Sequence, residues 1–436
     1  MLESHEEVGV RMQATKRIQM AVFLTVFVDL LGFGILIPIL PLYAQSLAAH
    51  PSLWMSRINV YLNLQSPGAF WVGVAFVSFS LMQFLASPVL GRISDLVGRR
   101  PVLWVSLMGS AVGYVMLAMT HRFEWVLAAR ILDGITGGNI SVAQAAMADI
   151  SKPEERSKTL GMIGAAFGLG FVIGPFLGGV LSDCDLGRSL LAQHGWYLPF
   201  MVAAALSLLA SILVLAWLPE TLPPEARTHA RRVERRGHAL VRALKRNGMP
   251  MLLGVALMSM TGFAMMEGTY SLLADKRFHL GQREVGYLFG FVGILIVIYQ
   301  GGLVRLVAKR VPERVAQLVG LLLMAGCLPL LAYAPWKWPF ILVMVPLAWG
   351  SGMNNTANAA LASQLTPPDE QGGLFGVINS MQGMGRILGP ALGTLVFARW
   401  GYAASYWVAA CAVGLGIPLA LFLPRHEPVL ELEEAP

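Results

Sequence analysis

Twelve long apolar stretches constrain the fold of this 436-residue chain more than any other feature. About 20 mostly apolar residues are enough for a helix to cross a membrane, and each stretch meets that length. Only 13% of the residues are charged, against about 25% in soluble proteins. The sequence therefore predicts an all-α integral membrane protein with twelve transmembrane helices. The predicted spans are 18–43, 68–90, 101–120, 125–148, 159–182, 196–218, 248–274, 284–307, 316–334, 338–362, 372–398 and 402–423.

The positive charges predict the orientation of these spans. Lys and Arg are enriched on the cytoplasmic segments of membrane proteins. With the N-terminus in the cytoplasm, most of the 32 Lys and Arg residues fall on cytoplasmic segments. We therefore expect a multi-pass protein of the cell membrane, by default the bacterial cytoplasmic membrane, with both termini inside. The net charge of +7 follows from this topology, so the lipid bilayer rather than nucleic acid is the expected partner.

The spans form two groups of six that are related by an internal repeat. A shift of 215 residues aligns Gly168–Gly178 with Gly383–Gly393, and Asn139 with Asn354, without a gap. Paired six-helix bundles of this kind are typical of secondary transporters, with the substrate site between the bundles. We expect an N-terminal bundle over 1–219, a basic cytoplasmic linker over 220–247 and a C-terminal bundle over 248–436.

Away from the span ends, five charged residues lie inside the predicted spans, namely Asp29, Arg130, Asp133, Glu267 and Arg386. A charge at the centre of the bilayer costs about 2.5–3.5 kcal/mol, so such residues usually face a cavity and mark a transport pathway. Asp29 and Glu267 supply one carboxylate from each half. Low dielectric favours the protonated form of a carboxyl group, and a nearby arginine favours the ionised form. Movement between two such environments would couple transport to protons, with Arg130 as the candidate partner of Asp29.

Several of these polar residues allow two interpretations. Asp133 follows Arg130 by three residues, so the two could instead neutralise each other on one helix face. Arg386 could face the cavity and pair with Glu267 or an anionic substrate, or it could extend toward the membrane surface. Amides in one span either bind substrate or join neighbouring helices. The amide candidates for the substrate cavity are Asn354, Asn358 and Gln382.

The spans contain no metal-binding cluster and no Ser-His or Asp-Asp constellation of the kind that an intramembrane enzyme needs. We therefore expect no enzymatic activity, no metal and no cofactor. The energy source would be a proton gradient, and the partners would be protons and a small-molecule substrate. A monomer is the expected state.

Two short motifs have a physical rationale. The cytoplasmic loop between spans 2 and 3 contains Gly91, Asp95, Gly98, Arg99 and Arg100. Its glycines allow a tight turn, Asp95 can cap a helix end, and the arginines can pair with carboxylates across the halves. Span 5 contains close-packing glycines around a proline, which would make a leak-tight hinge. These residues are Gly170, Gly174, Pro175, Gly178 and Gly179.

The loop resembles the G-x-x-x-D-x-x-G-R-[KR] signature of the major facilitator superfamily, and the span 5 motif resembles the signature of its drug/proton antiporters. Residues 29–41 and 130–138 are similar to the first and fourth spans of the twelve-helix drug exporters. In the family, the loop locks the outward-open state, and the arginine of the fourth span takes part in proton transfer. The first half is most like the tetracycline/proton antiporter group. Those exporters carry an Asp in span 3 where this chain has Gly113 and Tyr114, so the resemblance implies a drug-type antiporter.

The resemblance implies proton-coupled efflux of amphipathic, drug-like small molecules by alternating access. Asp29, Arg130, Glu267 and Asp133 would take part in proton coupling. The alternative on the same fold is a proton-coupled symporter for a sugar or an organic anion, which Arg386 and the amides of span 10 favour weakly.

Overall fold

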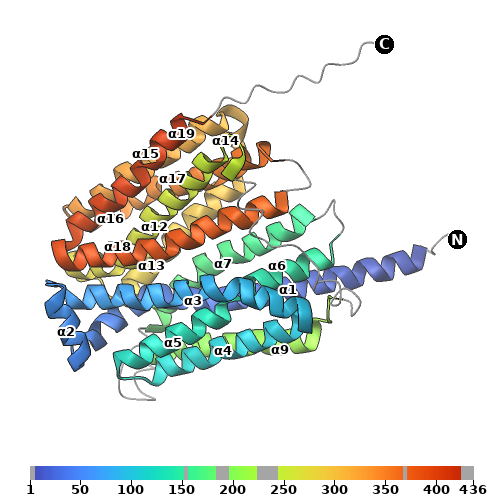
Figure 1. Cartoon of the computed structure of the whole chain (residues 1–436), viewed down its shortest axis with the longest axis horizontal. Helices are drawn as coiled ribbons and strands as arrows, with labels where there is room; N and C mark the ends of the chain where they lie inside the picture. Colours follow the sequence, from blue (N-terminus) through green and yellow to red (C-terminus); the bar gives the residue numbers. More distant parts are fainter. Residues whose placement is uncertain (1–4, 152–155, 183–195, 223–243, 367–370, 424–436) are drawn as a thin grey trace, which may run out of the picture.

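The computed structural model is all-helical and consists of two bundles of helices (Figure 1). It describes residues 5–151, 156–182, 196–222, 244–366 and 371–423. The first bundle contains α1 (His5–Ala48), α2 (Leu53–Tyr61), α3 (Pro67–Val97), α4 (Arg99–Met119), α5 (Phe123–Thr136), η1 (Gly137–Asn139), α6 (Ile140–Asp149), α7 (Arg156–Ser182) and α9 (Tyr197–Trp217). The second contains α12 (Met249–Phe278), α13 (Gln282–Ile298), η4 (Tyr299–Leu303), α14 (Val304–Arg310), α15 (Glu313–Tyr333), α16 (Lys337–Leu342), α17 (Met344–Gln364), α18 (Gln371–Gly414) and α19 (Gly416–Leu421).

These helices confirm the twelve-span architecture. In the described part of the chain, eight helices are long and apolar enough to cross a membrane. One of them holds two spans, because the chain turns at Gly401, where φ is +87° inside α18. The remaining predicted spans, 125–148, 284–307 and 338–362, are each divided into shorter helices. Most of the predicted linker, residues 223–243, lies outside the described residues.

The internal repeat is visible in how the helices pack. In the first half, α7 packs on α1 so closely that a Cβ atom on Gly34 would lie 2.7 Å from the carbonyl oxygen of Gly170. In the second half, α18 packs on α12, and a Cβ atom on Gly389 would lie 2.7 Å from the carbonyl oxygen of Thr261. Gly174 and Gly389 are equivalent positions in the repeat, and Gly174 also contacts Gly34. Small residues allow this backbone approach in membrane helices.

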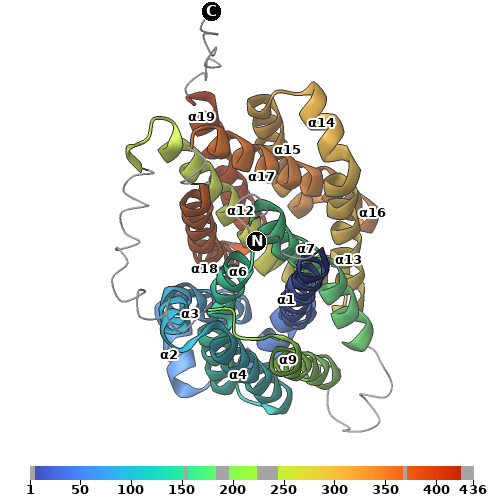
Figure 2. The ribbon, with the colours of Figure 1, turned by 90° about the vertical axis from the view of Figure 1, so that its right-hand side faces the viewer.

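The two halves meet tightly at the end of the molecule that carries α2, called here the α2 end. The backbone N–H groups of Gln65 and Ser66 both donate to the carbonyl oxygen of Ala398, at 2.9 Å. The helix pairs α3–α18 and α7–α13 form most of the contact between the halves (Figure 2). A Cβ atom on Gly179 would lie 2.8 Å from the Cα atom of Gly286. Gly179 of the span 5 motif therefore belongs to the seal between the halves.

The halves diverge toward the opposite end, called here the loop end because it carries residues 91–100 (Figure 1). Cβ atoms built on Gly164, Gly168, Gly302 or Gly376 would meet no atom within 4 Å. Gly164 and Gly168 lie on α7 and Gly376 lies on α18, two helices that also form the seal at the α2 end. Gly302 lies on η4, which continues from the sealing helix α13. The bundles are thus in contact at the α2 end and apart at the loop end (Figure 1). This arrangement is called here closed at the α2 end and open at the loop end.

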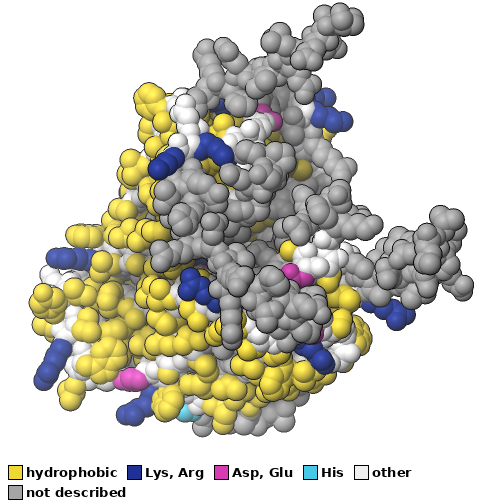
Figure 3. All heavy atoms as spheres, turned by 45° about the vertical axis from the view of Figure 1, so that its right-hand side comes forward, with side chains coloured by type: hydrophobic (Ala, Val, Ile, Leu, Met, Phe, Trp, Pro, Cys, Tyr) yellow, Lys and Arg dark blue, Asp and Glu magenta, His cyan; other side chains and the backbone are white. Residues whose placement is uncertain are grey.

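The outer flanks of the bundles are apolar. Hydrophobic side chains cover much of the visible described surface in Figure 3. Large side chains such as Val105, Ile212, Ile294 and Leu322 are at least half exposed. In a membrane protein such surfaces face lipid rather than water.

Candidate functional site

Arg130 and Asp133 form a buried ion pair on α5. The guanidinium Nη1 donates to the Asp133 carboxylate at 2.6 Å, and the two side chains are 1% and 2% exposed. The guanidinium also lies over the Phe79 ring of α3, 4.0 Å from its centroid. Of the two interpretations of this pair, the structure supports mutual neutralisation. Arg130 does not pair with Asp29 in this conformation, because Asp133 is closer along its own helix.

Asp29 has an amide partner instead. The Asn139 side chain, at the end of η1, donates to the Asp29 carboxylate at 3.2 Å. Asn139 is buried, whereas Asp29 is half-buried. Asp29 therefore keeps part of its surface exposed, while one hydrogen bond from a neutral amide joins it to the end of η1.

The third span completes this polar cluster from α4. Tyr114 is buried and interacts electrostatically with Asp29, Arg130 and Asp133. A Cβ atom on Gly113 would lie 3.4 Å from Cβ of Asp133. At the position where tetracycline exporters carry a carboxylate, this chain therefore has a small residue against which Asp133 of α5 packs.

Glu267 and Arg386 form a second charged group, in the other half. Both side chains are half-buried, and they interact electrostatically between α12 and α18. The Arg386 guanidinium lies 5.6 Å from the ring centroid of Phe171, which belongs to α7 of the first half. Arg386 thus faces the region between the halves, as one of its two interpretations predicts.

The amide candidates differ in position. The Gln317 side chain of α15 donates to Oδ1 of Asn358 at 2.9 Å, and both residues are buried. Asn354 of α17 is buried against Gly320, which lies on α15 like Gln317. These contacts favour helix packing within the second half over substrate binding. Gln382, one turn before Arg386 on α18, is half-buried.

The loop residues form a network within the first half. The buried Arg99 side chain donates to Asp95 at 2.6 Å and to Asp149 at 3.0 Å. It also donates to the Ser94 hydroxyl at 2.6 Å. The Arg100 side chain donates to the carbonyl oxygen of Leu215. We expected partners across the halves, but the described partners are all in the first half, because the two bundles diverge at this end.

Glu220, directly after α9, caps the start of α4. Its carboxylate accepts hydrogen bonds from the backbone N–H groups of Arg99 at 2.8 Å and Arg100 at 3.3 Å. Gly98 precedes them with φ +110° and contacts the same carboxylate. A negative charge at a helix N-terminus is stabilising. The first residues after the sixth span are thereby fixed to the loop.

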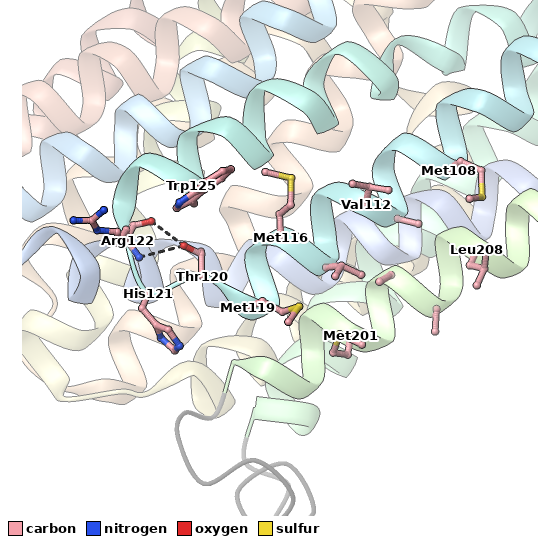
Figure 4. Close-up of a pocket in the computed structure, with 14 residues that line it drawn as sticks. Met108, Val112, Met116, Met119, Thr120, His121, Arg122, Trp125, Met201 and Leu208 are labelled. Atoms are coloured by element: carbon pink, nitrogen blue, oxygen red, sulfur yellow. Dashed lines mark hydrogen bonds between the residues drawn. The ribbon is translucent and has the colours of Figure 1, made fainter.

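One cavity lies away from these charges. It has a volume of about 820 Å³ and lies between α4, α9 and the start of α5, within the first half (Figure 4). Its wall is mainly apolar, with Met108, Met116, Met119 and Met201, and it becomes polar only at its Thr120–Arg122 end. Because its helices belong to one half, this cavity is not the space between the halves.

Sequence reasoning missed several residues that surround the charges. Asn139 was found only as a repeat partner of Asn354, and its position after the Gly-rich end of α5 gave no sign that it reaches Asp29. Asp149 and Glu220 could have been noted as carboxylates at span ends near the basic loop. Phe171 stands out in the sequence only as the repeat equivalent of Arg386. Among the described residues, no cluster of three or more His, Cys, Asp or Glu side chains could hold a metal ion.

Comparisons with known proteins agree with this architecture. Residues 22–345 and 306–435 match the family described as Major Facilitator Superfamily. The chain is 30% identical to major facilitator superfamily domain-containing protein 10 of Bos taurus, over 93% of this chain and 91% of that protein. It is 31% identical to the class C tetracycline resistance protein of Escherichia coli, over 88% of this chain and 89% of that protein.

Two solved structures are similar along nearly the whole chain. The crystal structure of the human organic anion transporter MFSD10 (TETRAN) has a TM-score of 0.67 at 26% identity, covering 93% of this chain and 99% of that chain. A bacterial homologue of the human lysosomal transporter Spinster, in an inward-facing and unoccupied conformation, has a TM-score of 0.72 at 14% identity, covering 93% of this chain and 96% of that chain. The second likeness concerns the fold alone. The resemblance seen in the sequence motifs is confirmed.

Proposed function

This chain belongs to the major facilitator superfamily and is a membrane transporter, and we propose that it is a proton-coupled antiporter that exports amphipathic small molecules by alternating access. The observation that carries this proposal is the pair of half-buried carboxylates, Asp29 in one half and Glu267 in the other. Half-buried carboxylates inside a membrane are costly and usually mark ion pathways. The tetracycline resistance proteins among the relatives support export of drug-like compounds.

The orientation predicted from Lys and Arg makes the loop end cytoplasmic. The conformation closed at the α2 end is then inward-open, and Asp29 and Glu267 face a space that substrate reaches from the cytoplasm. In this cycle the carboxylates release protons inward and substrate binds. The halves then close at the loop end and open at the α2 end, where protons return to the carboxylates and substrate leaves.

The Arg99 network provides a physical reason for two states. In the inward-open conformation, Arg99 is held by Asp95 and Asp149 of its own half. When the bundles close at the loop end, the partly exposed Asp95 would meet the second half. The loop would then stabilise the outward-open state, as the family resemblance implies. We further propose that the protein acts as a monomer in a cell membrane, with both termini in the cytoplasm.

The proton gradient supplies enough free energy for this exchange. One charge that crosses a potential of 100 mV gains about 2.3 kcal/mol. Each tenfold difference in proton concentration adds about 1.4 kcal/mol. One proton per substrate would therefore support a gradient of an uncharged substrate of roughly tenfold to several hundredfold.

A second candidate function is the transport of an organic anion. Arg386 is a half-buried cation between the halves, next to the Phe171 ring. A similar protein of known structure is named an organic anion transporter. An anion with an apolar body would find a charge and a ring at the same place.

Uptake into membrane vesicles of known sidedness tests the proposal. An exporter accumulates its substrate in everted vesicles energised by respiration, and a protonophore abolishes the accumulation. Lipophilic cations, tetracyclines and amphipathic organic anions would be compared one at a time, with empty-vector vesicles as the control. Accumulation only in right-side-out vesicles would contradict export and favour uptake of a solute.

A further inference from the structure

A row of three aromatic rings joins the two charged groups across the halves. The Phe79 ring of α3 stacks on the Phe33 ring of α1, with centroids 5.2 Å apart. Phe33 in turn contacts the Phe171 ring of α7 at 5.9 Å. Arg130 lies over Phe79 at one end of the row, and Arg386 lies over Phe171 at the other. Each end of the row therefore holds an arginine within the range of a cation–π interaction.

The ring and the arginine at the Phe171 end of the row occupy equivalent positions of the repeat. Phe171 in α7 aligns with Arg386 in α18 under the same 215-residue shift that aligns Gly170 with Gly385 and Gly174 with Gly389. Two arginines in these positions would repel each other, and two phenylalanines would leave Glu267 without a cation. The chain has one of each, which attract across the interface between the halves.

Arg386 contacts the ring rather than the carboxylate in this conformation. Within the described part of the chain, the ion pairs join Arg99 to Asp95 and Asp149, and Arg130 to Asp133. Arg386 acts electrostatically on Glu267, but no ion pair joins these two described residues. An arginine beside a carboxylate forms strong charge-assisted hydrogen bonds, so the ring competes with Glu267 for this guanidinium.

We propose that Phe171 is a positioning residue that holds the Arg386 guanidinium away from the Glu267 carboxylate in the conformation open at the loop end. Glu267 then remains free to exchange a proton, and a substrate can take its place as the partner of Arg386. Because Phe171 belongs to the first half and Arg386 and Glu267 to the second, relative movement of the halves changes this separation. The role of Phe171 in proton exchange rests on the antiport proposed above. Its role in positioning Arg386 does not depend on that proposal.

No other titratable group described near Arg386 and Phe171 takes the place of Arg386 beside Glu267. On the first half, Arg130 is neutralised by Asp133, and Asp29 is bound by Asn139. On α12, Tyr270 is buried toward the α2 end, and Asp275, Lys276 and Arg277 follow at the end of that helix. Arg386 is therefore the cation that decides the environment of Glu267.

A double-mutant cycle tests the position of Arg386 without requiring transport. The melting temperature of the purified protein would be measured for Glu267→Gln, Arg386→Gln and the double variant, each with and without Phe171→Leu. We expect the interaction between Glu267 and Arg386 to be weaker when Phe171 is present and to grow by a few degrees when Phe171 is replaced. Phe171→Met provides a second ring-free variant should Phe171→Leu fail to fold. Equal interaction in both backgrounds would overturn the proposal.

The pH profile of transport tests the consequence for proton exchange. In proteoliposomes containing a pH-sensitive dye, Phe171→Leu is expected to move the midpoint of substrate-triggered proton release by about one pH unit toward acid, since an ion pair favours the ionised carboxylate. Phe171→Tyr, which keeps the ring, and Phe23→Leu, which alters a ring stacked on Phe27, should keep the original midpoint. Addition of Arg386→Gln to Phe171→Leu should abolish the shift.

An unchanged midpoint in Phe171→Leu, or an equal shift in Phe23→Leu, would overturn the role in proton exchange. If the unmodified protein releases no protons with any compound, the proposed antiport fails. The double-mutant cycle then still decides whether Phe171 positions Arg386, so the two failures are distinguishable.

Discussion

Removal of one partner of the Arg130–Asp133 pair should strongly destabilise the protein. The two side chains are 1% and 2% exposed and 2.6 Å apart, so Asp133→Asn leaves Arg130 buried with its charge uncompensated. Loss of one member of a buried pair costs about 3–5 kcal/mol. Because 1 kcal/mol corresponds to about 2–4 °C for domains of 150–250 residues, we expect the melting temperature to fall by roughly 6–20 °C.

The double variant Arg130→Gln with Asp133→Asn should recover most of this loss, because no buried charge is left unpaired. Its remaining deficit should be about 1–2 kcal/mol, for the contact between Arg130 and the Phe79 ring. Thermal unfolding of the detergent-purified protein, followed by size-exclusion chromatography, measures all three variants. Asp29→Asn is the matched control and should change the melting temperature by only a few degrees, since Arg130 does not contact Asp29. A double variant as unstable as the sum of the two single variants, or Asp29→Asn as damaging as Asp133→Asn, would refute this assignment of partners.

Four further outcomes are expected. Asp29→Asn should reduce gradient-driven transport at least about tenfold while substrate binding persists, measured as uptake and as equilibrium binding to the same preparation. Gly174→Val should destabilise the protein by about 1–3 kcal/mol because α1 lies directly against it, whereas Gly168→Ala, in open space, should be neutral in the same melting assay. Glu220→Ala should cost about 1 kcal/mol through loss of the helix cap, and an unchanged melting temperature would argue against that cap. Asp95→Asn should slow turnover without weakening substrate binding, and unchanged turnover would reduce the loop to a topology signal.

The sequence predicted the spans and their grouping well, because both depend on local and repeated patterns. Hydropathy alone determines which stretches cross a membrane, and the glycine repeat indicated that spans 5 and 11 are equivalent. The structure supplies their partners, because α7 packs on α1 and α18 packs on α12. The short helix α2 was not predicted. It lies in the loop between the first two spans, where the Trp54 indole donates to Glu124 at 3.2 Å and the Trp71 indole of α3 donates to Asn59 at 2.9 Å.

The partners of the charged residues were harder to predict than their importance. Residue spacing allowed either Asp29 or Asp133 as the partner of Arg130. Only the structure of α5 shows that Asp133 forms the ion pair with its guanidinium. The bond from Asn139 to Asp29 joins residues 110 positions apart, and no local pattern encodes such a contact. The loop arginines were expected to reach across the halves, but their partners depend on which end of the molecule is closed, which is a property of the conformation.

The central claim is that protons and substrate move in opposite directions through Asp29 and Glu267. Its most direct test uses proteoliposomes with a pH-sensitive dye inside and an imposed inside-acid gradient, to which candidate compounds are added one at a time. The account predicts proton efflux on addition of an amphipathic compound, with loss of the signal in Asp29→Asn and in Glu267→Gln. Proton movement that persists unchanged in both variants, or substrate transport without any proton movement, would contradict it.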